Sequence, residues 1–325
     1  MAPTSSAADP GRVMVLAGGL SHERDVSLRS GRRVSEALRG TGLAVEERDV
    51  DATLLPALMA EPPACVVPML HGETGEDGAI REVLELLDIP YVGATPAVCR
   101  TAFDKPVAKA LAEHAGIRTP RSTCLPHEMF RELGAAAVLE SLVAKLGLPL
   151  MVKPAQSGSA LGCTVVHNVS ELPSAMVNAY AYGPVALIEQ FIAGDEVAVP
   201  VIDDGTGPRA LPVVAIMPDG GVYDYTARYT AGSTEFVVPA QLPEATLEEC
   251  TRVAIAAHEV LGLRDLSRSD LIVDADGQVW WLEVNVAPGF TETSTVPLSI
   301  QAAGLDLGKV IAELVQAAVA RPAHS

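Results

Sequence analysis

The chain has 325 residues, of which 49% are hydrophobic and 20% charged, and its formal net charge is −18. This length predicts two or three domains, and the acidic balance argues against nonspecific binding to nucleic acid or anionic membranes. No segment approaches the roughly 18 to 20 apolar residues that span a bilayer, and the first residues, MAPTSSAADPG, do not resemble a signal peptide. Five scattered cysteines without a CxxC pair are typical of a reducing compartment. We therefore expect a cytoplasmic protein without structural zinc and with neither nucleic acid nor membrane as a partner.

The first hundred residues alternate between strand and helix patterns. Strands are predicted at residues 12–18, 46–51, 64–72 and 89–93, and helices in the second half of residues 20–40 and at residues 76–87. Such alternation predicts an α/β fold with a parallel sheet. Ligands of these sheets bind beyond the carboxyl ends of the strands, where the loops Gly18-Gly19 and His71-Gly72 are expected.

The remaining chain is richer in strands. Asp104 is predicted to cap a helix that has Pro106 in its first turn. Further strands are predicted at residues 148–153, 163–169 and 184–192 and in much of 189–285, with helices at residues 244–262 and 303–320. The pattern of predicted elements changes near residues 97 and 188. These approximate boundaries predict domains at residues 1–97, 98–188 and 189–325.

One apolar segment, RSDLIVDADGQVWWLEVN, predicts a β-hairpin that carries carboxylates. If the Asp-Gly dipeptide forms a two-residue turn, Asp270 faces Glu283 and Arg268 faces Asn285, with all four on one face of the sheet. Opposed like charges destabilise a sheet, but a divalent cation between them would reverse that effect. Carboxylate and amide oxygens suit Mg²⁺, so we predict a metal site, with a solvated polar face on an edge hairpin as the alternative.

Several charged residues suggest an anionic ligand. Lys153 ends a strand before the loop PAQSGSALG, whose N–H groups could hold phosphate, although the Walker motif is absent and an ordinary tight turn is the alternative. Lys105 lies in the first turn of a helix, where the dipole disfavours a cation, so it is either an anion ligand or a surface lysine. Glu189 and Glu196 flank a turn and could accept hydrogen bonds from adenine and ribose, or could be surface carboxylates.

Other loops could bind a small charged substrate. Glu23 could bind an ammonium group or stabilise a helix start, and His71 could contact a carboxylate or be an ordinary polar loop residue. In NVAPGFTETS, Gly289 and Ser294 could present an N–H and a hydroxyl to a carboxylate, with Arg268 adding charge; ordinary turn chemistry is the alternative. The segment YDYTARYTAGSTEF is typical of a loop that covers a site, or of a simple hairpin.

In chain order, the motifs resemble those of the D-alanine–D-alanine ligases, members of the ATP-grasp family. They are GG…HERDVS, HGETGEDG, DIPYVG, FDKPVAK, VKPAQSGSALG, IEQFIAGDE, YDYTARY, SRSD and LEVNVAPG. The resemblance covers about residues 12–318 and implies a three-domain ATP-grasp architecture with an N-terminal parallel-sheet (Rossmann-like) domain. The implied reaction phosphorylates the carboxylate of one D-alanine with ATP. The amine of a second D-alanine then attacks the acylphosphate, which gives a peptidoglycan precursor.

The resemblance also implies a role for each matching residue. ATP would be bound by Lys105, Lys153, Glu189, Glu196 and Arg228, and two Mg²⁺ ions, or Mn²⁺, by Asp270, Glu283 and Asn285. The first D-alanine would be bound by Glu23 and His71, the oxyanion by Arg268 and the N–H of Gly289, and the second D-alanine by Ser294. A hydrogen-bonded trio of Glu23, Ser159 and Tyr229 would close the loop over the site. A homodimer is also implied.

Some positions depart from the family pattern. Arg228 replaces a lysine, Ala160 a serine, Phe290 a methionine and Ser267 a glycine. Because Phe290 and Ser267 are expected near the acceptor pocket, the second substrate could differ from D-alanine, as in a specialised paralogue. The less favoured hypothesis is a nucleotide-binding regulator without catalysis.

Overall fold

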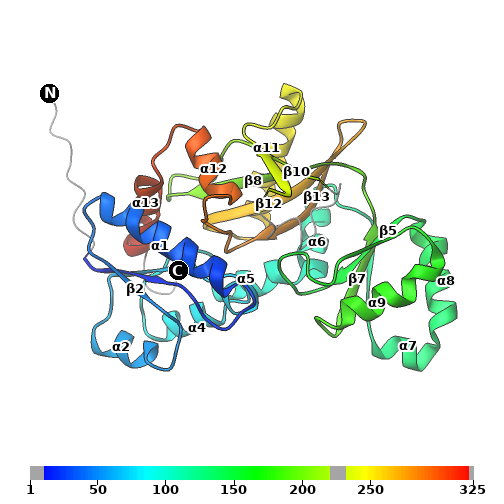
Figure 1. Cartoon of the computed structure of the whole chain (residues 1–325), viewed down its shortest axis with the longest axis horizontal. Helices are drawn as coiled ribbons and strands as arrows, with labels where there is room; N and C mark the ends of the chain where they lie inside the picture. Colours follow the sequence, from blue (N-terminus) through cyan, green and yellow to red (C-terminus); the bar gives the residue numbers. More distant parts are fainter. Residues whose placement is uncertain (1–10, 220–231, 322–325) are drawn as a thin grey trace.

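The computed structural model describes residues 11–219 and 232–321. Within these ranges the chain forms three sheets with helices packed around them (Figure 1). No helix in the described part of the chain is long and apolar enough to cross a membrane.

The first sheet is parallel, with strand order β2-β1-β3. It is built from β1 (Val13–Leu16), β2 (Val45–Arg48) and β3 (Cys65–Pro68), with α1 (Arg24–Gly40), α2 (Leu54–Ala60), α3 (Glu73–Glu76) and α4 (Ala79–Leu86) between and after them. The strand predicted at residues 89–93 is reduced to a single parallel bridge between Val66 and Tyr91. The glycine loop after β1 and the His71 loop after β3 both lie at the carboxyl end of this sheet, as predicted.

The second sheet is antiparallel, with strand order β4-β7-β5-β6. It contains β4 (Ser122–Pro126), β5 (Leu150–Pro154), β6 (Thr164–Val166) and β7 (Val185–Gln190). The associated helices are α7 (Glu128–Leu133), α8 (Ala135–Leu146), the short 3-10 helix η1 (Val169–Glu171) and α9 (Leu172–Tyr180). An apolar core that includes Leu142, Leu150 and Leu172 joins these helices to the sheet. This part of the molecule lies at one end of the long axis (Figure 1).

The third sheet has strand order β11-β10-β8-β12-β13, and β9 pairs with β8. The strands are β8 (Gly194–Asp203), β9 (Arg209–Ala210), β10 (Val214–Pro218), β11 (Thr234–Val237), β12 (Asp265–Asp274) and β13 (Val279–Asn285). Its largest core packs one face against α5 (Pro96–Phe103), α6 (Lys105–His114) and α11 (Glu244–Val260). Asp104 accepts a hydrogen bond from the N–H of Val107 and so caps α6, as predicted.

The C-terminal helices connect the third sheet with the first. The helix predicted at residues 303–320 corresponds to α13 (Leu307–Ala320), and it is preceded by α12 (Thr295–Ala302), which was not predicted. One apolar cluster contains Val13 and Val15 of β1, Ile300 of α12 and Leu314 of α13. The carboxyl end of the parallel sheet is thereby held against the loop that follows β13, where the candidate site lies.

Candidate active site

Two pockets meet between the three sheets. The central pocket is lined by α1, the His71 loop, β12 and the loop after β13; its residues include Glu23, His71, Glu76, Ser159, Arg268, Asn285, Gly289 and Ser294. The lateral pocket, of about 720 Å³, lies between the second and third sheets and includes Lys153, Glu189, Glu196 and Met217. That volume lies in the range of small-molecule sites. Both pockets are lined by Lys105, Ser157, Ile216, Asp270 and Glu283.

Strand alternation explains why an apolar strand carries charged residues. On β12, Leu271 and Val273 are buried in the core on the helical face of the sheet, so Arg268 and Asp270 point to the opposite face and into the central pocket. Ser267 therefore faces the helices, where its hydroxyl is 2.8 Å from Nδ1 of His258 in α11.

The predicted pairing of the charged hairpin is confirmed. Arg268 lies opposite Asn285, and Asp270 lies opposite Glu283. The predicted two-residue turn is wrong. The carbonyl of Asp274 accepts a hydrogen bond from the N–H of Gly277, and the N–H of Asp274 donates to the carbonyl of Gln278. Asp274 therefore pairs with Gln278, and the loop between them has three residues. A bulge shifts the register between Asp270 and Leu271. The extra residue in the turn and the irregularity in the ladder offset each other, so the charged pairs keep the predicted register.

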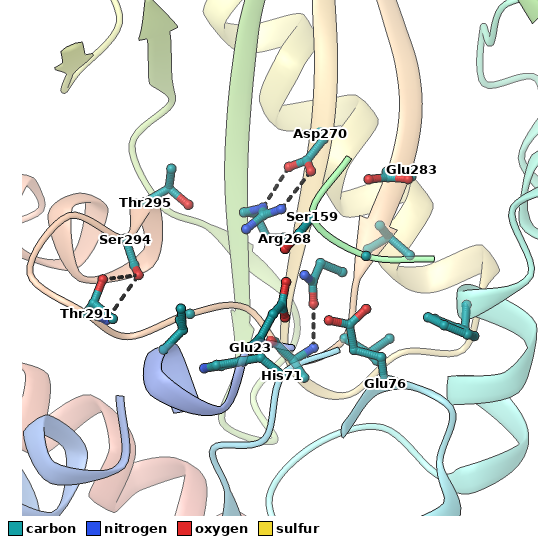
Figure 2. A pocket seen from close by; sticks show the side chains of 18 of the residues that line it. Glu23, His71, Glu76, Ser159, Arg268, Asp270, Glu283, Thr291, Ser294 and Thr295 are labelled. Carbon is teal, nitrogen blue, oxygen red and sulfur yellow. Dashed lines mark hydrogen bonds and ion pairs between the residues drawn. The ribbon is translucent and has the colours of Figure 1, made fainter. Parts of the chain in front are cut away.

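Each hairpin carboxylate is held by a different cation. Asp270 accepts two hydrogen bonds of 2.7 Å from the guanidinium of Arg268, and Glu283 lies 3.4 Å from Nζ of Lys105. Nζ of Lys105 also donates to the carbonyl of Ser157, at 2.5 Å. Asp270 and Glu283, the acidic pair, lie where the two pockets join. Figure 2 shows both carboxylates in the central pocket.

The donor set of this junction fits a hard divalent cation. Two opposed carboxylates and the nearby amide of Asn285 are oxygen ligands of the kind that Mg²⁺ prefers, with substrate phosphates supplying further oxygens. The Asn285 Oδ1 atom accepts a 2.7 Å bond from the N–H of Ala287, which fixes the orientation of the amide. In the described part of the chain no three His, Cys, Asp or Glu side chains form a metal cluster, so an ion here would depend on Asp270, Glu283 and that amide.

The lateral pocket contains a buried chain of alternating charges. Glu189 is 2% exposed and lies 2.6 Å from Nζ of Lys153 and 2.9 Å from Nζ of Lys109. Burial opposes ionisation of Glu189, but the two lysines outweigh it and lower its pKa. Burial likewise disfavours the charged form of Lys153, yet the Glu189 carboxylate raises its pKa. Glu189 is thus ionised and fixed by two cations, while Glu196 lines the same pocket from β8.

Lys109 was not predicted as a functional residue. It is buried on α6, and Nζ is also close to the hydroxyl of Thr119. A signal was present in the sequence, because Lys109 follows Lys105 by four residues and therefore lies on the same face of the helix.

A second residue that sequence reasoning missed is Glu76. Its carboxylate is buried near that of Glu23 in the central pocket (Figure 2) and accepts a hydrogen bond from the N–H of Gly72. Burial and then the charge of Glu23 raise the pKa of Glu76 to about 8. A Cβ added to Gly158 would lie within 3.9 Å of the carboxylates of both Glu76 and Glu23. The glycine-rich loop that contains Gly158 therefore approaches these two glutamates closely. Glu76 belongs to the motif HGETGEDG, in which His71 is the predicted site residue.

His71 is buried, and protein atoms hold both ring nitrogens. Nδ1 donates to the carbonyl of Ala287 and Nε2 lies 2.9 Å from the hydroxyl of Ser30, which also accepts the N–H of Phe290. Burial lowers the pKa of His71 to about 4, so the ring is neutral at pH 7. His71 therefore ties the loop after β3 to the loop after β13 and lines the pocket without carrying charge.

The loop after β13 brings Gly289 and Ser294 together. A Cβ on Gly289 would lie 2.8 Å from Oγ of Ser294, and this hydroxyl accepts a hydrogen bond from the N–H of Thr291. Ser159 reaches the central pocket from the glycine-rich loop with a φ of 54°. The remaining predicted site residues, Arg228 and Tyr229, lie outside the described residues.

Phe290 and Ser267, which are expected near the acceptor, line neither the central nor the lateral pocket. Phe290 is fully buried in the apolar cluster between the first sheet and α13. Ser267 faces α11 because of strand alternation, as described above. Both residues are thus next to pocket residues in the chain, as expected, but their side chains point away from the pocket.

Comparison with known proteins identifies the family. The family model for the D-ala D-ala ligase C-terminus matches residues 111–316, and that for the N-terminus matches residues 45–94. The chain belongs to the D-alanine–D-alanine ligase family. A family member named D-alanine–D-alanine ligase, from Pelotomaculum thermopropionicum, is 37% identical over 308 residues, which cover 95% of this chain and 96% of the relative.

Solved structures of this family share the fold. The VanG D-Ala:D-Ser ligase from Enterococcus faecalis has 26% sequence identity and a TM-score of 0.82, with coverage of 94% of this chain and 98% of that chain. The D-alanine–D-alanine ligase from Bacillus anthracis complexed with ATP has 27% identity and a TM-score of 0.79, with coverage of 95% and 97%. Membership confirms the predicted ATP-grasp fold class and the predicted enzyme class, an ATP-dependent ligase.

Proposed function

We propose that this chain joins two D-alanine molecules to D-alanyl-D-alanine with consumption of ATP, and so supplies a precursor of peptidoglycan. The observation that carries this proposal is the junction of the two pockets. A pocket of nucleotide size opens beside two opposed carboxylates and Lys105, and these same residues line the pocket that contains Glu23, Arg268 and Ser294. Family membership supports the identity of both substrates.

ATP occupies the lateral pocket in this proposal. Lys105 and Lys153 bind the phosphates, and Glu196 and Glu189 lie toward the ribose and adenine. Because Glu189 is already held by two lysines, its main contribution is to orient Lys153, with any contact to adenine made alongside that ion pair. Arg228 is assigned to the phosphate site on the resemblance alone.

We assign Asp270, Glu283 and Asn285 as ligands of two Mg²⁺ ions, for which Mn²⁺ could substitute. Bound there, the ions would neutralise charge on the transferring phosphoryl group. Arg268 and Lys105 hold the two carboxylates in place at the junction. The side chains of Arg268 and Lys105 are also close enough to the junction to contact the phosphoryl group itself.

The central pocket orients the two amino acids. Glu23 binds the ammonium of the donor, and Arg268 with the N–H of Gly289 stabilises the oxyanion when the acceptor amine attacks the acylphosphate. Ser294 binds the carboxylate of the acceptor. We assign the trio of Glu23, Ser159 and Tyr229 to closure over the site, which would exclude water from the acylphosphate.

A second candidate function is ligation of D-alanine to a different acceptor. The similarity to the D-Ala:D-Ser ligase of E. faecalis supports it, whereas the burial of Phe290 and Ser267 argues against a direct contact of these side chains with the acceptor. A regulator without catalysis is less well supported, because Asp270, Glu283 and Lys105 are present at the pocket junction and Lys153 lines the lateral pocket.

Phosphate release with ATP, Mg²⁺ and D-alanine, compared with the same reaction plus D-serine, D-lactate or L-alanine, tests these alternatives. Product masses read in parallel identify the acceptor, because competing acceptors divide according to their kcat/KM values. Release with D-alanine alone and the mass of the dipeptide would support the first proposal. A mixed product in large excess would support the second, and no release under any condition would contradict both.

We also propose a cellular location, a division into domains and an oligomeric state. ATP as the co-substrate is consistent with a cytoplasmic location. Boundaries near residues 97 and 188 remain our proposed division into domains, although α5 and α6 pack against the third sheet and share its core. The homodimer rests on the family resemblance and stays a prediction.

A further inference from the structure

Arg29 brings a positive charge to the central pocket from α1. Val26 lies three residues earlier and therefore on the same face of the helix. A Cγ atom of Val26 would be 4.0 Å from a Cβ on Gly289, and the hydroxyl of Ser30 accepts the N–H of Phe290 at 3.0 Å. This face of α1 thus packs against the loop after β13, and Arg29 lines the same pocket as Gly289 and Ser294.

The charges that line this pocket are unevenly paired. Its carboxylates are Glu23, Glu76, Asp270 and Glu283. Lys105 is close to Glu283 and Arg268 binds Asp270. The exposed guanidinium of Arg29, in contrast, has no ion pair or hydrogen bond with any described residue. Arg29 is therefore available to a bound anion, in a chain whose net charge is −18.

The neighbouring wall of the pocket consists of hydroxyl groups. Thr291, Ser294 and Thr295 lie on one side, and Glu76 and Glu283 on the other (Figure 2). Ser294 precedes α12 but makes no side-chain capping bond to it, so the first N–H groups of that helix are not bound by this side chain. Hydroxyls, a helix start and a guanidinium together favour a carboxylate over a neutral group.

We propose that Arg29 binds the α-carboxylate of the acceptor amino acid beside Ser294, and thereby makes that carboxylate a requirement for acceptors. The inference rests on the proposed ligation and assigns the residue that decides between an acceptor acid and its amide. The planar guanidinium can form two parallel bonds to a carboxylate, whereas a lysine at this position can supply only a point charge.

The test is a competition between D-alanine and D-alaninamide as acceptors in one reaction with ATP and Mg²⁺. D-Alaninamide lacks a free carboxylate and cannot act as the donor, so both products share the same activated donor. The ratio of the two product masses then reports only how the acceptors are discriminated. The enzymes compared are wild type, Arg29→Gln, Arg29→Lys and the control Arg32→Gln. Arg32 is an exposed arginine on the same helix that does not line either pocket described above.

For Arg29→Gln we expect the preference for D-alanine over D-alaninamide to fall by about ten- to a hundredfold, the usual effect of losing a charged hydrogen bond. Arg29→Lys should lie between that variant and wild type, and Arg32→Gln should match wild type. If Arg29→Gln keeps the wild-type product ratio, the inference is wrong. If wild type forms neither product, the proposed function itself has failed, so the two failures are distinguishable.

Discussion

Asp270 and Glu283 face each other across the hairpin of β12 and β13, at the point where the two pockets join. Asp270 is bound by Arg268 and Glu283 lies near Lys105, so neither carboxylate depends on the other for its orientation. The hairpin therefore presents two fixed acidic groups to the junction of the two pockets.

Glu283→Gln should lower turnover by about a hundredfold or more, because the junction loses one of its two carboxylates and Lys105 loses its charged neighbour. The loss should grow at low Mg²⁺ concentration, since the remaining ligands bind the ion more weakly. Phosphate release measured over a Mg²⁺ titration checks this. The control is Glu248→Gln, which changes an exposed carboxylate on α11. Equal Mg²⁺ dependence in both variants would contradict the assignment of Glu283.

Lys109→Met should destabilise the protein and weaken ATP binding. Removing one cation leaves Glu189 buried with Lys153 as its remaining ion-pair partner. Leaving a buried charge with no partner costs about 3 to 5 kcal/mol, and we expect a smaller loss here because Lys153 still compensates Glu189. Urea unfolding gives the change in free energy of unfolding, and the KM for ATP gives the effect on the pocket. Lys309→Met, at an exposed position on α13, is the control. Unchanged unfolding and an unchanged KM would refute a positioning role for Lys109.

Glu76 should make stability fall as pH rises. Its folded-state pKa is raised to about 8 by burial and the charge of Glu23, from an ordinary value of 4.5. Between these values the folded state binds a proton that the unfolded state has released, so the free energy of unfolding decreases with increasing pH. Glu76→Gln cannot ionise and should remove this contribution.

Urea unfolding of wild type and Glu76→Gln at several pH values from 5 to 9 measures the difference. We expect the variant to gain stability relative to wild type as the pH rises through the window from 4.5 toward about 8. Parallel pH profiles for the two proteins would show that Glu76 is not buried in its neutral form.

Gly289→Ala should reduce activity with little loss of stability. The new Cβ would be 2.8 Å from the hydroxyl of Ser294, so the serine must move in the wall that is proposed to bind the acceptor. Displacement of about 1 Å in an active site can cost about a hundredfold in rate. Gly40→Ala places its Cβ where no atom lies within 4 Å and is the matched control. Acceptor KM and kcat, measured beside thermal unfolding, separate the two effects, and wild-type kinetics for Gly289→Ala would contradict the assigned geometry.

The charged hairpin shows how far sequence reasoning can reach. Alternation along the apolar strands placed the charged residues on one face, since a slip of one residue would have moved a charge into the core. The pairing of Asp270 with Glu283 rested on the two-residue turn, and it holds because a bulge offsets the extra loop residue. The turn could not be predicted correctly, because a three-residue loop and a bulge give the same distal register as a two-residue loop. The family resemblance, carried by motifs from both ends of the chain, is confirmed.

Residues whose role depends on packing were harder to predict. Lys109 is buried because α6 packs against the third sheet and its ammonium pairs with Glu189 of the second. The raised pKa of Glu76 depends on burial and then on the charge of Glu23, which is distant in the sequence. Phe290 shows the reverse error: sequence proximity to Gly289 suggested a pocket residue, but its side chain points into the apolar cluster. Local sequence patterns could predict on which element and face a charged residue lies. Tertiary packing decides which charged residues from different elements come into contact.

The most direct test of the central claim is the reaction of the purified chain with ATP, Mg²⁺ and D-alanine, followed by phosphate release and by product mass. We expect phosphate release that depends on D-alanine, with D-alanyl-D-alanine formed in equal amount. Phosphate release without the dipeptide, or no release at all, would contradict the proposal that the paired pockets join two D-alanines.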